Sequence, residues 1–104
     1  MPARTAALLA ATSVGMAGCA SAGTRPGPER SAVGRMVFAT SCRACHSLSG
    51  ASSARQQGGD LLDVHLRRPV LLQFTAEMPV RRRLHRAEVE AVVDYVLAVQ
   101  RQSR

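Results

Sequence analysis

The sequence predicts a small all-α domain of three to four helices. Apolar residues recur at helical spacing near the C-terminus, a shorter apolar pattern covers residues 33–38, and a proline opens a third apolar stretch at residue 69. The chain has 104 residues, which allows one such domain and nothing larger.

The predicted first helix is the amphipathic segment from Val33 to Phe38. The middle helix begins at Pro69, since proline is favoured at the first position of a helix, and continues through the apolar residues 70–74. The last helix has the clearest apolar stripe, formed by Val89, Val92, Val93, Val96 and Leu97. Glu88 and Glu90 near its start and Arg101 near its end suit the helix dipole.

The composition indicates that these helices need something more than their own side chains to form a core. The chain has no tryptophan, one tyrosine and two phenylalanines, so the large aromatic side chains of ordinary cores are nearly missing. Domains of this size usually need a disulfide framework, a metal or another staple. Three cysteines are too few for a framework. A large buried cofactor would fill the gap.

The formal charge is +7, and all basic residues are arginine. No aromatic residues alternate with the clusters at Arg67-Arg68 and Arg81-Arg82-Arg83, so the pattern argues against nucleic acid. An acidic protein partner or an anionic lipid fits better. A genome bias that leaves a solvated arginine-rich face explains the composition equally well.

Residues 1–18 are expected to be a signal peptide, with Arg4 in the positive region and a short apolar run from Ala6 to Val14. The run closes on residues 16–19, Met-Ala-Gly-Cys, which resemble the lipobox of bacterial lipoproteins except for Met16. Cys19 is therefore the predicted lipidation site, with ordinary signal-peptidase cleavage or an uncleaved anchor as alternatives.

Residues 19–31 are rich in Ala, Ser, Gly and Pro and are expected to be a lipid-anchored flexible tether before a domain at residues 32–104. If Cys19 carries the lipid, two cysteines remain for the next motif. The predicted protein is thus exported, periplasmic or extracytoplasmic, and anchored to the membrane through Cys19.

The pattern with the most specific chemistry is C-x-x-C-H at Cys42, Cys45 and His46. It is read as covalent c-type haem attachment. Two thiols separated by two residues reach the two vinyl groups of one porphyrin, and the adjacent histidine then reaches the iron from one face. A thioredoxin-like dithiol would need a preceding strand and a longer α/β chain. A zinc site would need a second ligand pair, for which only the irregular pair His65 and His85 is present.

With these motifs in place, residues 31–101 resemble the class I (monohaem) c-type cytochromes in their bacterial lipoprotein form. The resemblance implies the small cytochrome c fold, with the helices wrapped around one covalently attached haem c and its iron. It places Gly34 and Phe38 of the first helix against Val92 and Tyr95 of the last.

The same resemblance implies the remaining site residues. His46 and Met78, which precedes Pro79, would be the axial metal ligands, and Arg67 would meet a haem propionate. Residues 58–61, Gly-Gly-Asp-Leu, stand where the family has Gly-Pro-x-Leu, so Gly59 replaces the proline whose carbonyl orients the proximal histidine. The spacing of 32 residues from His46 to Met78 is compact for the family.

Other residues compete for these roles. His65 and His85 are alternative distal ligands, although both are expected to be exposed, with His85 near the N-cap of the last helix. Met36 is expected in the core, and Tyr95 at the helix crossing. Arg67 and Arg68 could each face either a propionate or solvent.

The function predicted from these features is periplasmic electron transfer by a monomer that is a carrier and not an enzyme. Arg43 and Arg55 would steer it onto an acidic redox protein, a reductase or a terminal oxidase. The alternatives are a haem subunit of a larger respiratory oxidoreductase complex, a haem sensor or peroxidase-like protein with an open distal site, and a haem-free lipoprotein.

Overall fold

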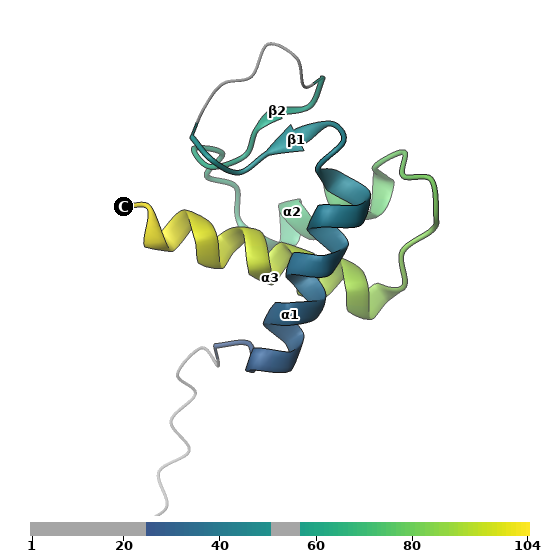
Figure 1. Ribbon diagram of the computed structural model, residues 1–104, viewed down its shortest axis with the longest axis horizontal. Coiled ribbons are helices and arrows are strands. Elements are labelled where there is room, and N and C mark those ends of the chain that lie inside the picture. The colour runs from purple at the N-terminus through teal and green to yellow at the C-terminus, as the bar shows by residue number, and fades with distance from the viewer. Residues whose placement is uncertain (1–24, 51–56) are drawn as a thin grey trace, which may run out of the picture.

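The computed structural model describes residues 25–50 and 57–104. Within these ranges the chain forms α1 (Pro28–Val37), η1 (Phe38–Cys42), β1 (His46–Ser47), β2 (Gly59–Asp60), α2 (Arg68–Glu77) and α3 (Arg86–Gln102). In Figure 1, α1 crosses α3, α2 lies behind them, and the two short strands lie at the far end of α1. The prediction of a mostly helical domain is confirmed. No helix of the described part is long and apolar enough to cross a membrane.

The first helix begins earlier than the sequence predicted. α1 starts at Pro28 and so includes the last four residues of the segment expected to be a tether. The physical reason is local, because proline has the helical φ and lacks only an N–H that would be unsatisfied there, and Glu29 suits the first turn. The predicted signal peptide, Cys19 and Arg55 lie outside the described residues.

The crossing of α1 and α3 forms the core. Gly34 packs so closely on α3 that a Cβ atom at this position would overlap the Ala91 carbonyl and the Tyr95 side chain. One turn later the ring of Phe38 meets that of Tyr95, with 5.9 Å between the centroids. Val37, Phe38, Val92 and Val96 form the buried cluster beside them. This confirms the predicted crossing.

The prediction for Met36 was wrong. Its side chain is 65% exposed, not in the core. The face of α1 that meets α3 carries Gly34 and Val37, and 3.6 residues per turn leave position 36 on another side of the helix.

The middle helix, α2, differs from the other two because none of its residues is buried, although it packs along α3. Pro69 lies in its first turn and Arg67 is its N-cap. It ends at Glu77, and the backbone of the C-cap residue Met78 is extended, because a residue that precedes proline is pushed out of the helical region.

The last helix is well defined at its start. His85 is its N-cap, as the sequence predicted, and its backbone N–H donates to the Glu88 carboxylate at 2.8 Å. Arg82 also donates to Glu88, with both bonds at 2.8 Å. These bonds, the one from Arg82 first, lower the pKa of Glu88 to about 2.

Candidate functional site

An apolar cleft lies between α2, α3 and the chain around the C-x-x-C-H motif. Most of the side chains in its wall are aliphatic or aromatic, and Cys42, His46 and Met78 are among them. The full lining is Phe38, Cys42, His46, Leu61, Val64, Leu66, Leu71, Phe74, Thr75, Met78, Val80, Leu84, Val92, Val93 and Val96. The cleft therefore gathers three of the predicted site residues.

A π-helical turn delivers Cys42 to the cleft. The backbone N–H of Arg43 donates to the Phe38 carbonyl at 2.9 Å, a bond that spans five residues. The Thr40 hydroxyl donates to the Met36 carbonyl at 2.9 Å, within the last turn of α1. As a result Phe38 and Cys42 both line the cleft. Burial raises the pKa of the Cys42 thiol, whereas Cys45 is exposed, and the two thiols are free.

His46 is held by the short parallel pairing of β1 with β2, in which it lies opposite Gly59. The Gly58 N–H donates to the Cys45 carbonyl at 2.7 Å, just before the pair. A Cβ atom at Gly58 would overlap Nδ1 and Cε1 of the His46 ring, so only glycine fits beside the imidazole. This edge of the ring faces Gly58, and the His46 residue also lines the cleft.

The Gly59 carbonyl, at the position of the family's proline carbonyl, does not accept a hydrogen bond from His46. His46 Nδ1 is buried and has no hydrogen-bond partner in the described part of the chain. Gly59 has a φ of +72°, a left-handed conformation that proline cannot adopt. Glycine at this position is therefore required by the local backbone, in which the family pattern of Gly-Pro-x-Leu would not fit.

The Asp60 carboxylate organises the chain on both sides of the strand pair. It accepts hydrogen bonds from the Ser47 hydroxyl at 2.7 Å, from the Ser49 and Gly50 backbones at 3.0 Å each, and from the Leu62 backbone at 2.8 Å. These bonds, the Ser47 hydroxyl first, lower the pKa of Asp60 to about 2. The carboxylate thus fixes the segment that carries His46.

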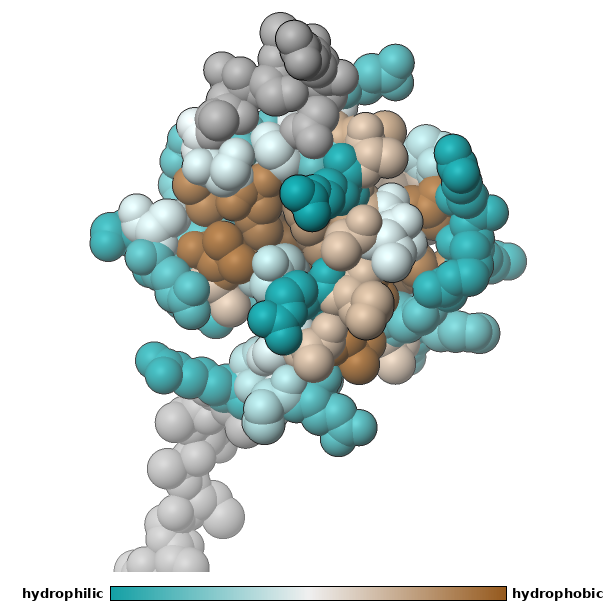
Figure 2. Space-filling model, viewed as in Figure 1, coloured by the Kyte–Doolittle hydropathy of each residue, from teal (hydrophilic) through white to brown (hydrophobic). Residues whose placement is uncertain are grey.

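The side of the cleft formed by α2 and the residue that follows it is partly exposed to solvent. Met78 is 42% and Phe74 47% exposed, although both line the cleft. Apolar side chains also reach the surface in the view of Figure 2, where polar residues interrupt them. The enclosed volume is about 120 Å³, which is below the roughly 300–1,000 Å³ of ordinary ligand and cofactor sites. A large planar ligand would need the cleft to widen, with the Phe74 side chain turned outward.

Several predicted residues lie elsewhere. Arg67 is exposed at the N-cap of α2 and is not among the residues that line the cleft. Arg68 points to α3, where its Nε donates to Asp94 at 2.8 Å. His65 and His85 are exposed, as expected, and neither lines the cleft. In the described residues, no three His, Cys, Asp or Glu side chains form a group that could hold a metal ion.

Sequence reasoning missed Gln100. This residue is 2% exposed, and its side-chain amide donates to the carbonyls of Leu61 and Val64, both at 2.7 Å. It ties the loop that supplies one wall of the cleft to α3. The signal was weak, because a lone glutamine on a long helix is ordinarily solvated.

In comparisons with known proteins, the chain matches no family model, no curated protein and no solved structure.

Proposed function

We propose that this domain is an extracytoplasmic electron-transfer protein with one haem c attached through Cys42 and Cys45. His46 would ligate the iron on one face and Met78 on the other. One observation carries the proposal: the apolar cleft has Cys42, His46 and Met78 in its wall. The cleft also lies beside a helix, α2, that has no buried residue of its own.

The donor set suits this group. A thioether needs a thiol that reaches a vinyl group at the edge of the ring, and Cys42 lines the cleft while Cys45 follows at its outside on a turn. The Cys45 N–H donates to the Cys42 carbonyl at 3.1 Å, which keeps the turn compact. A histidine nitrogen and a methionine sulfur are the axial ligands of c-type electron carriers.

The apolar walls of the cleft give a second line of support. α2 presents Leu71 and Phe74 to the cleft, and α3 presents Val92, Val93 and Val96 from the other side. A planar apolar group between the two walls would complete the core that the sequence lacks, at the cost of turning out Phe74, which is already 47% exposed, while Met78 would stay directed into the cleft. Burying the apolar area of the walls then stabilises the domain at about 25 cal/mol per Å².

The residues of this chain would hold and insulate the cofactor. Bound haem supplies an iron that alternates between the ferrous and ferric states. The aliphatic walls exclude water, and Gly58 keeps the His46 ring in place by leaving no room beside it. If His46 and Met78 both held the iron, they would leave no position open for a substrate. The protein would therefore be a carrier and not an enzyme.

The charge favours an acidic redox partner. Arg43 is exposed and lies between Cys42 and Cys45, the two residues that would carry the ring. The chain as a whole carries a formal charge of +7. Complementary charge raises association rates and makes them fall with added salt. A rate of association with the redox partner that did not depend on ionic strength would contradict an acidic partner.

The test is expression of the full chain with a haem-maturation system, followed by haem staining on a denaturing gel. We expect a stained band that Cys42→Ala and Cys45→Ala each weaken strongly and that the double variant loses. Cys19→Ser removes the third thiol of the chain and should keep full staining. Staining that survives loss of both Cys42 and Cys45 contradicts the attachment.

Met36 provides a matched control for the distal ligand. Met78→Ala should remove the weak long-wavelength band of methionine-ligated ferric iron and allow carbon monoxide to bind the ferrous protein. Met36→Ala removes a side chain that is more exposed and does not line the cleft, so its spectrum should equal that of the parent. A parent spectrum without this band would favour the open-site sensor or a histidine-ligated form, and a band that survives in Met78→Ala would contradict Met78 as the ligand.

A further inference from the structure

A second cleft, rich in arginine, lies where the first turns of α1 and α2 meet α3. It is a half-open hollow of about 770 Å³ lined by Arg25, Pro26, Gly27, Arg30, Arg68, Asp94, Leu97 and Arg101. None of these residues lines the apolar cleft. The proposed function leaves this feature unused.

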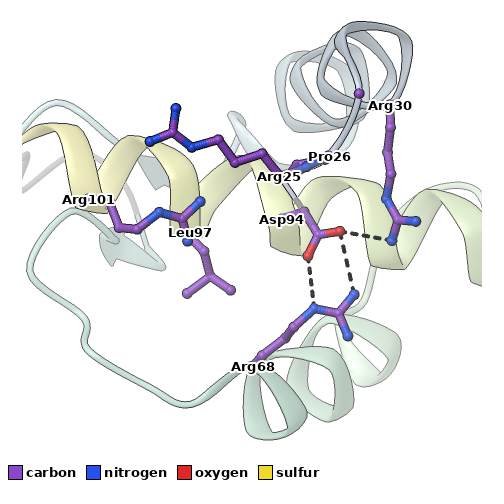
Figure 3. Close-up of a pocket in the computed structure, with 8 residues that line it drawn as sticks. Arg25, Pro26, Arg30, Arg68, Asp94, Leu97 and Arg101 are labelled. Carbon is purple, nitrogen blue, oxygen red and sulfur yellow. Dashed lines mark hydrogen bonds and ion pairs between the residues drawn. The ribbon is translucent and has the colours of Figure 1, made fainter. Parts of the chain in front are cut away.

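The charges of the arginine cleft are unbalanced. Asp94 is its single acid, and it is already shared by Arg30 and Arg68, at 2.8 Å from each. Figure 3 shows this bridge, with Arg25 and Arg101 extending away from it beside Leu97. In the described part of the chain neither Arg25 nor Arg101 has a carboxylate within ion-pair distance, and the remaining residues include no Asp or Glu. Four arginines and one aspartate leave a net charge of +3 in the lining.

The helix ends add to this potential. Gly27 and Arg67 are the N-caps of α1 and α2, and neither end has a capping hydrogen bond from a side chain. The first-turn N–H groups there carry partial positive charge and favour an anion. Both helices have ten residues, and both contribute to the cleft through Gly27, Arg30 and Arg68.

The chemistry points to a phosphate. Guanidinium groups bind phosphate oxygens through pairs of parallel hydrogen bonds, and Arg25 and Arg101 are both available for this. Pro26 and Leu97 provide apolar surface in the same hollow, which suits the glycerol and upper acyl part of a phospholipid. A free phosphate would use only the arginines.

The arginine cleft begins close to Cys19 in the sequence, and this favours a membrane lipid over free phosphate as the source of the phosphate group. Arg25 follows Cys19 by six residues, a stretch that spans at most about 20 Å when extended. If Cys19 carries a lipid, as the sequence predicts, the cleft stays within that distance of the membrane surface. On α3, Val92 and Val96 of the apolar cleft lie at least about 100° around the helix from Asp94, Leu97 and Arg101, and Val93 lies between the two faces. A headgroup in the arginine cleft would leave the apolar cleft turned away from the bilayer.

We infer that the arginine cleft binds the phosphate headgroup of an anionic phospholipid and so sets the orientation of the domain on the membrane. The inference uses the predicted anchor only for the source of the phosphate, and it does not depend on haem. Arg25 and Arg101 are the two residues that contact the headgroup, while Arg30 and Arg68 line the cleft and are held by Asp94.

The test uses the full chain with Cys19→Ser, which has no lipid of its own, in flotation assays with vesicles. Phosphatidylglycerol mixed with phosphatidylcholine is compared with phosphatidylcholine alone. Arg25→Gln together with Arg101→Gln should weaken binding to the anionic vesicles by about thirtyfold, since each basic residue near such a surface contributes about fivefold. The matched control, Arg81→Gln with Arg83→Gln, removes the same charge outside the cleft and should cost less than about fivefold.

Equal losses in the two double variants would overturn the inference, because binding would then follow total charge. Inorganic phosphate at millimolar concentration should not displace the vesicles at constant ionic strength, and displacement would overturn the lipid as the source. Helical circular dichroism and haem content are read on the same samples, so a failure of haem attachment is separate from a failure of vesicle binding. Should the double variant not fold, Arg25→Gln alone is tested, with Arg83→Gln as its control.

Discussion

The side-chain nitrogen of Gln100 lies 2.7 Å from the carbonyl oxygen of Leu61, which joins α3 to the loop that follows β2. The same nitrogen donates to the Val64 carbonyl. Leu61 and Val64 both line the apolar cleft. One buried amide therefore holds a wall of the candidate site in place.

Gln100→Met keeps the length of this side chain and removes both donors. The Val64 carbonyl then loses the Gln100 donor, and the Leu61 carbonyl keeps only the longer bond from the Val64 N–H at 3.3 Å. We therefore expect the free energy of unfolding to fall by about 2 kcal/mol, measured from the urea midpoint. Gln102→Met, at an exposed position near the end of α3, should change stability by less than about 0.5 kcal/mol. Equal effects of the two substitutions would show that the hydrogen bonds of Gln100 contribute little.

Gly34→Ala tests the helix crossing. The added methyl group would overlap the Ala91 carbonyl and the Tyr95 side chain, and overpacking of this kind costs about 1–3 kcal/mol. Gly27→Ala is the matched control, because a Cβ there meets no atom within 4 Å. Thermal unfolding should give a clearly lower midpoint for Gly34→Ala alone, and a midpoint at or above that of the parent would contradict the close packing.

Acid should weaken the segment around His46. The folded pKa of Asp60 is about 2, against an ordinary value of 3.8, so between these values the unfolded chain binds more protons than the folded one. Stability then rises with pH across this window, and the contribution of Asp60 is complete above about pH 4 and lost as pH falls toward 2. Asp60→Asn should flatten the melting temperature against pH in this range.

Asp63→Asn serves as the comparison for that experiment. Asp63 is exposed and its carboxylate accepts no hydrogen bond in the described part of the chain, so its substitution should leave the slope unchanged. A slope that both variants share with the parent would mean that Asp60 makes no contribution to the acid transition.

The two thiols of the motif should differ in reactivity before any cofactor is attached. Burial raises the pKa of Cys42, while Cys45 is exposed. Since the thiolate is the reactive form, iodoacetamide at neutral pH should alkylate Cys45 several times faster than Cys42. Peptide mass spectrometry of the Cys19→Ser chain measures both rates, and urea should make them equal. Faster labelling of Cys42 would contradict the burial of its side chain.

The parts of the fold that sequence could predict depend on short-range patterns. The apolar stripe of α3 and the proline that opens α2 follow from helical period and local backbone preference. The contact of Gly34 and Phe38 with Tyr95 came from a family resemblance, and the structure places these residues together. Assignments of Cys42, Cys45, His46 and Met78 to a haem remain predictions.

The parts that sequence could not predict depend on long-range contacts. Gln100 bonds to carbonyls more than 35 residues away, and no local signal marks such a partner. Met36 was wrongly expected in the core, because the segment around it is apolar on more than one side and only the packing of α1 on α3 selects a face. The left-handed backbone at Gly59 likewise follows from its pairing with His46.

The lack of any buried residue in α2 has a consequence for the order in which the molecule opens. Helices that bury little apolar surface unfold locally at low free energy, so the amides of α2 should exchange hydrogen with solvent well before those of α1 and α3. Local opening of α2 would expose the wall of the apolar cleft while the crossing at Gly34 stays intact. The domain could then admit a large planar molecule, and close over it, without global unfolding.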